Sequence, residues 1–254
     1  MTQIPVPTAK YSIMSNSMDN LKKLIDDLDK IGIRPFIGYG NPDAHILIIG
    51  KECADEDKER QEKFYTYNFE QWAESFNGHG FSYRSGEEPY DFEHGNFHPI
   101  YPFFVQCNKI CRTGMNNGGT SATYYYYQRL IDKIRSRALV NYTKSRCIDF
   151  FKDCFITELN DICRKNDTGL SKTEHLETKE HIQLRFDWMR KTNFFNQFKI
   201  VILACGPYAK AIQDDAILRK DLFGNASVYY CSQLSRWDKK LDEDIIPEII
   251  KNDL

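Results

Sequence analysis

The chain lacks an excess of charge of either sign. Among its 254 residues, 34 are Lys or Arg and 36 are Asp or Glu, so the formal net charge is -2 at pH 7. A nearly neutral protein has no overall positive field that attracts nucleic acid. Contact with DNA would therefore have to come from a local patch of basic side chains.

Long apolar runs are absent as well. No apolar segment approaches the ~20 residues that a helix needs to span a bilayer. The residues that follow Met1 are polar and are interrupted by Pro5 and Pro7, unlike the apolar region of a signal peptide. We therefore expect no association with membranes and a cytoplasmic location.

The sequence has no Cys-x-x-Cys pair, although it contains 8 cysteines. Cysteines in a chain without a secretion signal are typical of the reducing cytosol. Cys107 and Cys111 are better explained as two buried thiols than as half of a metal site. His94 and His98 lie one helical turn apart in spacing, but the glycine and proline beside them disfavour a helical zinc site. We expect neither a metal ion nor a cofactor.

Short apolar runs alternate with amphipathic segments along the chain. The apolar runs predict strands at 45–50, 153–160, 198–206 and 227–230. Helical spacing of apolar residues predicts helices at 17–31, 127–138, 181–195 and 208–220. This alternation favours a parallel sheet that is covered by helices on both faces. We expect a single domain over residues 1–254, a three-layer α/β/α sandwich around a four-stranded, mainly parallel sheet.

An aromatic-rich stretch at about 55–123 separates the first two predicted strands. It begins with a run of charged residues and continues with many Phe, Tyr and Trp residues. We interpret it as an insertion that packs over the carboxyl edge of the sheet. Its aromatic side chains are expected to form a small core of their own, and direct stacking on nucleic-acid bases is the alternative.

Polar residues follow each predicted strand, at the edge where parallel sheets bind their ligands. Two of these segments resemble the paired active-site motifs of the uracil-DNA glycosylase superfamily. Gly50-Lys51-Glu52-Cys53 stands where the family has Gly-x-carboxylate-Pro, and Tyr230-Cys231-Ser232-Gln233-Leu234-Ser235 stands where it has His-Pro-Ser-x-Leu-Ser. The resemblance implies a uracil-DNA glycosylase-like fold. It also shows two departures, because Cys53 replaces the proline and Tyr230 replaces the catalytic histidine.

The resemblance implies specific roles in hydrolysis of an N-glycosidic bond. Glu52 would supply the carboxylate that stabilises the cationic sugar or positions water, and Tyr230 would donate a hydrogen bond to the departing base. A phenol is a weaker electrostatic partner than a tuned imidazole. A solvated charge and a large strand residue are the alternative interpretations of these two positions.

The resemblance also implies a base-binding site that includes Gly50, Lys51 and Cys53. Two alignments of the second strand remain open, and they place either Glu158 or Asn160 where the family has the asparagine that reads the base edge. An ionised glutamate only accepts hydrogen bonds and suits an exocyclic amine, whereas an asparagine both donates and accepts.

Contacts with DNA are expected along the rim of the same site. Leu234 matches the exposed leucine that wedges into the duplex when a nucleotide is extruded, and it lies among Ser232, Gln233 and Ser235. The basic side chains that would contact phosphates belong to Arg164 and Arg236. DNA is therefore the expected partner of a monomeric protein.

Two functions remain open from the sequence. One is a DNA glycosylase-like enzyme that removes a deaminated or mismatched, uracil-like base. The other is a catalytically inactive member of the family that binds nucleic acid, a nucleotide or a protein through the same cleft. A scaffold that presents exposed aromatic residues of the 55–123 stretch to a protein partner is a third, weaker interpretation.

Overall fold

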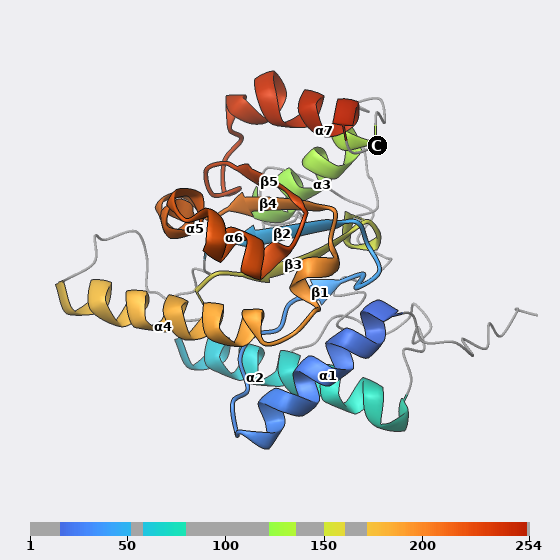
Figure 1. Ribbon diagram of the computed structural model, residues 1–254, viewed down its shortest axis with the longest axis vertical. Coiled ribbons are helices and arrows are strands. Elements are labelled where there is room, and N and C mark those ends of the chain that lie inside the picture. The colour runs from blue at the N-terminus through green and yellow to red at the C-terminus, as the bar shows by residue number, and fades with distance from the viewer. Residues whose placement is uncertain (1–15, 52–57, 80–121, 136–149, 161–171, 253–254) are drawn as a thin grey trace, which may run out of the picture.

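The computed structural model describes residues 16–51, 58–79, 122–135, 150–160 and 172–252. This part of the chain is an α/β structure in which a mixed, mostly parallel sheet lies between helices (Figure 1). Cys53, Glu52 and Arg164 lie outside the described residues, as does most of the aromatic-rich stretch.

The sheet has five strands in the order β1-β3-β2-β4-β5. Their bounds are Tyr39–Gly40 for β1, Ile46–Gly50 for β2, Cys154–Glu158 for β3, Ile200–Ala204 for β4 and Ser227–Tyr230 for β5. Strands β2 to β5 are mutually parallel and match the four predicted strands, whereas β1 pairs antiparallel with β3. The expected strand number was therefore wrong by one, because a two-residue strand leaves no periodic pattern in the sequence.

Two glycines allow β1 to approach β3 closely. Gly38 and Gly40 have φ values of 127° and 103°, a region that favours glycine. A Cβ atom at Gly38 would lie 2.3 Å from the carbonyl oxygen of Ile156, and one at Gly40 would lie 2.4 Å from that of Cys154. The chain can therefore lie against β3 here only because these two positions carry no side chain.

Seven α-helices occur in the described residues. They are α1 (Asn16–Lys30), α2 (Lys58–Glu74), α3 (Ala122–Ile134), α4 (Lys172–Arg190), α5 (Lys210–Asp214), α6 (Ala216–Phe223) and α7 (Ile246–Asn252). The helix expected over 208–220 is two helices. They separate at Asp215, whose side chain accepts hydrogen bonds from the backbone N–H groups of Ile217 and Leu218 and so caps α6.

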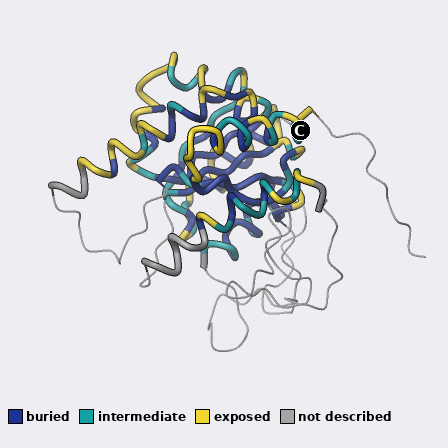
Figure 2. Tube along the Cα trace, turned by 90° about the horizontal axis from the view of Figure 1, so that it is seen from below, coloured by how far each residue is buried: buried dark blue, intermediate teal, exposed yellow. Residues whose placement is uncertain are grey.

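Alternation along the strands divides the core into two parts. Ile48 and Ile156 pack with α3 and α7 on what we call the α3 face, and Leu47 and Phe155 pack with α1, α4 and α6 on the α4 face. Figure 2 shows the buried strands in the middle of the molecule, with exposed residues along the outer helices.

Helix α2 contributes aromatic side chains to both parts of the core. Tyr65 packs on the α3 face, whereas Phe69 and Trp72 pack on the α4 face, and all three are buried. For these residues the expectation of a small separate aromatic core is wrong, because they belong to the two parts of the main core, and their burial also contradicts an exposed aromatic surface.

A buried arginine ties α4 to the sheet. Arg185 donates from Nη2 to the carbonyl oxygen of Phe36 at 2.9 Å and to Oγ1 of Thr157 at 2.6 Å, and that hydroxyl donates to the carbonyl oxygen of Ile37 at 2.8 Å. Hydrogen bonds of this kind offset the cost of burying a charged group. They fix the end of β3 against the segment that leads into β1.

Among the described helices, none combines the length and apolar character that a bilayer-spanning segment requires.

Candidate functional site at the carboxyl edge of the sheet

The register of the sheet brings the segments after β2 and β3 together. Gly50 is opposite Glu158 on one side and Ala204 on the other. Beyond the strands, the N–H of Asn160 donates to the carbonyl oxygen of Lys51 at 2.9 Å. Four of the expected base-binding residues, Gly50, Lys51, Glu158 and Asn160, therefore meet at one edge.

Glu158 is a partly buried carboxylate at the end of an otherwise apolar strand. Strand alternation directs its side chain to the α3 face, on the same side as Cys154 and Ile156. The hydroxyl of Tyr65 donates to its Oε2 at 2.9 Å. Because this bond comes from a buried side chain on α2, it orients the carboxylate. Asn160, the alternative base reader, is fully buried.

Tyrosine side chains surround this carboxylate. A Cβ atom at Gly50 would lie 3.2 Å from the hydroxyl oxygen of Tyr127 and 3.8 Å from Cγ of Glu158, so the glycine leaves room for the phenol. Tyr39 and Tyr124 share a hydrogen bond in the same cluster. We call Tyr39, Tyr65, Tyr124, Tyr127 and Glu158 the tyrosine–glutamate cluster.

Two phenols of this cluster, those of Tyr39 and Tyr127, are held in the protonated form. Burial raises the pKa of Tyr39 and of Tyr127 well above the ordinary value of 10.0, and neighbouring tyrosines and the charge of Glu158 raise both pKa values further. Neutral phenols are hydrogen-bond donors. The cluster therefore combines a carboxylate that accepts with hydroxyls that can donate.

Sequence reasoning missed the tyrosines of this cluster. The sequence feature that could have indicated them is the run of four tyrosines at Tyr124–Tyr127. This run lies on α3, where Tyr124 and Tyr127 are one helical turn apart. The contribution of Tyr65 could not be predicted, because α2 itself was not predicted.

Tyr230 lies on the other side of the sheet. It is the last residue of β5, and its neighbours Tyr229 and Cys231 face α3, so alternation directs Tyr230 to the α4 face. There its hydroxyl accepts a hydrogen bond from Nη1 of Arg219 at 3.4 Å. The structure therefore does not bring the expected histidine replacement together with Glu158.

The segment after β5 turns onto the α3 face. Leu234 is only 1% exposed and belongs to the core there, so the prediction of an exposed leucine is wrong. Burial of a leucine side chain stabilises the folded state by about 2 kcal/mol. Contacts of Trp237, Asp238 and Asp242 also hold the segment against the protein. Ser232 and Gln233 are partly buried, whereas Ser235 and Arg236 are exposed and remain available for contact with a ligand.

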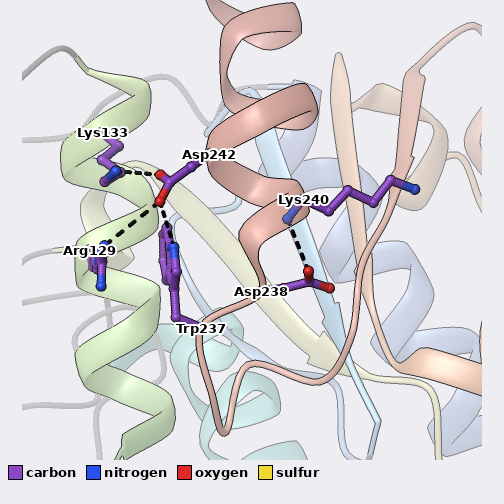
Figure 3. Close-up of polar contacts among 6 residues, drawn as sticks. All are labelled: Arg129, Lys133, Trp237, Asp238, Lys240 and Asp242. Atoms are coloured by element: carbon purple, nitrogen blue, oxygen red, sulfur yellow. Dashed lines mark hydrogen bonds and ion pairs between the residues drawn. The ribbon is translucent and has the colours of Figure 1, made fainter.

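Trp237 and Asp242 attach this segment to α3 (Figure 3). The indole Nε1 of Trp237 donates to Oδ2 of Asp242 at 2.8 Å, and the Lys133 ammonium pairs with the same carboxylate. The guanidinium of Arg129 lies 4.1 Å from the centre of the indole ring, a cation–π contact, and 3.8 Å from Asp242. We call Arg129, Lys133, Trp237 and Asp242 the tryptophan clasp.

Asp238 joins the beginning of this segment to its end. Its carboxylate accepts the backbone N–H of Ser232 at 3.1 Å and that of Lys240 at 3.0 Å. Burial opposes ionisation of both Asp238 and Asp242, but hydrogen bonds outweigh this effect and lower both pKa values. Asp238 accepts from Lys240 and Ser232, and Asp242 accepts from Lys133 and Trp237. Both carboxylates are therefore stabilised in the ionised form by the folded structure.

A pocket of about 630 Å³ opens on the α4 face at the same edge. It lies between α4 and the segment after β4, and its described lining residues are Leu176, Thr178, Lys179, Ile182, Pro207, Tyr208 and Ala211. The ammonium of Lys51 lies 4.9 Å from the centre of the Tyr208 ring. The mainly apolar lining is typical of pockets that hold part of a small ligand.

The described Cys, His, Asp and Glu residues form no candidate metal site. No group of three or more His, Cys, Asp or Glu residues suitable for a metal ion occurs in the part of the chain that the structure describes. Burial raises the pKa of Cys231 to about 12, so its thiol is protonated at neutral pH.

Comparison of the chain with family models, curated proteins and solved structures yields no match. The interpretation of the site therefore depends on its geometry and chemistry.

Proposed function

We propose that the protein binds a nucleobase, in DNA or in a nucleotide, at the carboxyl edge of its sheet, and that Glu158 reads the base. The observation that carries this proposal is the position of Glu158 at the end of a parallel strand, with its carboxylate oriented by Tyr65. Ligands of open α/β sheets bind at this edge.

The chemistry of the tyrosine–glutamate cluster suits the edge of a base. Bases present N–H donors next to carbonyl or ring-nitrogen acceptors. Glu158 supplies acceptors, and the protonated phenols are the type of group that supplies donors. The exposed side chains of Ser235 and Arg236 come from a segment that turns onto the same face, and they supply a local contact for a phosphate without a positive charge on the whole protein.

Hydrolysis of the N-glycosidic bond is a second candidate function. It is favoured by the pairing of Asn160 with Lys51, because Glu52 follows Lys51 directly in the sequence and a carboxylate is the group that such hydrolysis requires. The position of Tyr230 on the α4 face disfavours a catalytic role for its phenol at Glu158. Binding without hydrolysis therefore agrees better with the described geometry.

Oligonucleotide binding tests the proposal. Fluorescence anisotropy would be measured with single-stranded and duplex oligonucleotides that carry guanine, uracil, hypoxanthine, xanthine or a mismatched thymine. We expect saturable binding that weakens about tenfold or more in Glu158→Ala, the loss typical of a charge-assisted hydrogen bond. The control is Glu180→Gln, an exposed residue on α4. Absence of saturable binding to every oligonucleotide would refute the proposal.

The same samples distinguish binding from catalysis. Abasic sites are detected by alkaline cleavage of the strand. If abasic sites form and Glu52→Gln abolishes them, the protein is a glycosylase. If the oligonucleotides are bound and stay intact, the protein is a binding protein.

A further inference from the structure

The hydrogen-bonding capacity of Glu158 narrows the class of base. An ionised carboxylate has two oxygens with about four acceptor positions, and it donates nothing. One of these positions on Oε2 accepts from Tyr65 at 2.9 Å, which holds the group in one orientation. A carboxylate held in this way is complementary to two N–H donors that lie side by side, the geometry of a bidentate pair.

The common bases differ in whether they offer such a pair. Guanine presents its ring N1–H beside its exocyclic amine. Cytosine and adenine place a ring-nitrogen acceptor beside the amine, and uracil flanks its single N–H with two carbonyl oxygens, so an acceptor would face the carboxylate in each case. Hypoxanthine keeps the N1–H and the O6 of guanine but lacks the amine. Guanine and hypoxanthine therefore differ by one group only.

The surroundings of Glu158 complement the rest of the guanine edge. Next to its two donors, guanine carries O6, an acceptor. The hydroxyl of Tyr127, which lies beside Gly50 and near Glu158, is a protonated donor. A carboxylate next to a phenol thus matches two donors next to an acceptor.

We infer that Glu158 makes the site selective for a base with a guanine-type edge, in which a ring N–H adjoins an exocyclic amine. The inference rests on the proposed function, because it assumes that a base reaches the tyrosine–glutamate cluster. It adds the class of base and identifies Glu158 as the residue that determines specificity.

A matched pair of oligonucleotides tests this specificity. Short single-stranded thymidine oligonucleotides would carry one central guanine, hypoxanthine, cytosine or uracil, and their affinities for the full chain would be measured by fluorescence anisotropy. We expect guanine to bind about tenfold more tightly than hypoxanthine, within the range of one good bidentate pair. Competition by GMP and by IMP should show the same order.

Variants assign the preference to Glu158. In Glu158→Gln, an N–H group of the new amide faces an N–H donor of the base, and two donors cannot bond to each other. The ratio of the affinities for guanine and hypoxanthine should therefore fall to about one. Tyr65→Phe removes the orienting hydroxyl and should lower the ratio part of the way. Glu180→Gln should leave the ratio unchanged, and thermal unfolding of each variant shows that it is folded.

The outcomes separate this inference from the proposed function. If no oligonucleotide binds, both are wrong. If the wild-type protein binds all of the oligonucleotides with equal affinity, or binds guanine best but keeps this preference in a folded Glu158→Gln variant, the specificity inference is wrong and base binding stands.

Discussion

A charged side chain at the end of a buried strand requires compensation. Burial of a carboxylate is unfavourable unless hydrogen bonds replace its water. At Glu158 the hydroxyl of Tyr65 provides one such bond, and Tyr65 comes from a distant part of the chain. A residue that is costly to the fold and is nevertheless held in one orientation is a good candidate for a role in binding.

Single residues also decide whether β1 can form. In Gly38→Ala, the added methyl group meets the carbonyl oxygen of Ile156, and the residue is held at a φ that alanine rarely adopts. Gly32→Ala is the matched control, because Gly32 has a φ of 71° but no atom within 4 Å of an added Cβ. We expect Gly32→Ala to lower the free energy of unfolding by about 1 kcal/mol, from backbone strain alone.

For Gly38→Ala we expect a loss of about 3 kcal/mol or more, since the steric clash adds to the strain. Urea unfolding followed by circular dichroism measures both values. Equal losses in the two variants would mean that Gly38 is not in close contact with β3.

The burial of Leu234 makes a further prediction at the residue scale. In Leu234→Ala, we expect the free energy of unfolding to fall by about 3 kcal/mol, because the substitution opens a cavity in the core of the α3 face. The control is Ile217→Ala, a residue that is 76% exposed, for which a change within about 0.5 kcal/mol is expected. If Leu234→Ala weakened DNA binding without loss of stability, the leucine would act as an exposed wedge instead.

At the scale of elements, the tryptophan clasp and Asp238 determine where the segment after β5 lies. The clasp connects the segment to α3 and to the residues just before α7 through side chains that are distant in sequence, and Asp238 joins its two ends. The hydrogen bonds and ion pairs in these contacts are accepted by two carboxylates, Asp238 and Asp242, that the fold keeps ionised. The attachment of this segment should therefore depend on pH.

The sign of this dependence follows from the lowered pKa values. A carboxylate whose pKa is lower in the folded protein stabilises the fold above its ordinary pKa of 3.8, and this stabilisation is lost as the pH falls through the folded-state value. We expect Asp242→Asn to be less stable than the wild type at pH 7 and to lose less stability than the wild type below about pH 4.

Thermal unfolding measured between neutral and acidic pH tests this expectation. Asp244→Asn, an exposed aspartate in the same turn, is the control and should follow the wild-type curve. An Asp242→Asn variant that keeps the full acid sensitivity of the wild type would show that the clasp does not contribute to it.

Sequence patterns predicted the parallel elements well because each has its own apolar signature. Strand β5 has the bounds that were predicted, whereas α4 begins nine positions earlier than the predicted start at 181, at Lys172. The early part of α4 is exposed at Leu176 and carries no apolar stripe that could indicate a helix. Helix α2 escaped prediction for a different reason, since its aromatic side chains face both parts of the core instead of one.

At the scale of the whole molecule, the sheet separates two sets of candidate residues. The sequence placed the segments after the strands at one edge, and the register confirms this for Gly50, Lys51, Glu158 and Asn160. It could not tell which face each side chain occupies, because a shift of one residue along a strand moves every side chain to the opposite face. That is why Glu158 and Tyr230 were expected in one site and lie on different faces.

This separation predicts contrasting effects of two phenylalanine substitutions. Tyr230→Phe removes only the hydroxyl that accepts from Arg219 at 3.4 Å on the α4 face. A bond this long contributes little, so the free energy of unfolding should fall by no more than about 1 kcal/mol. Affinity for guanine-containing oligonucleotides should stay within about twofold of the wild type, as expected for a group with no contact to the ligand.

Tyr65→Phe also removes a single hydroxyl group, but it disturbs the orientation of Glu158. It should therefore weaken binding of the same oligonucleotides by about threefold to tenfold. Anisotropy titrations of both variants, compared at equal folded fraction, measure the difference. If Tyr230→Phe weakened binding as much as Tyr65→Phe did, the base would contact the α4 face, where the pocket beside Tyr208 lies.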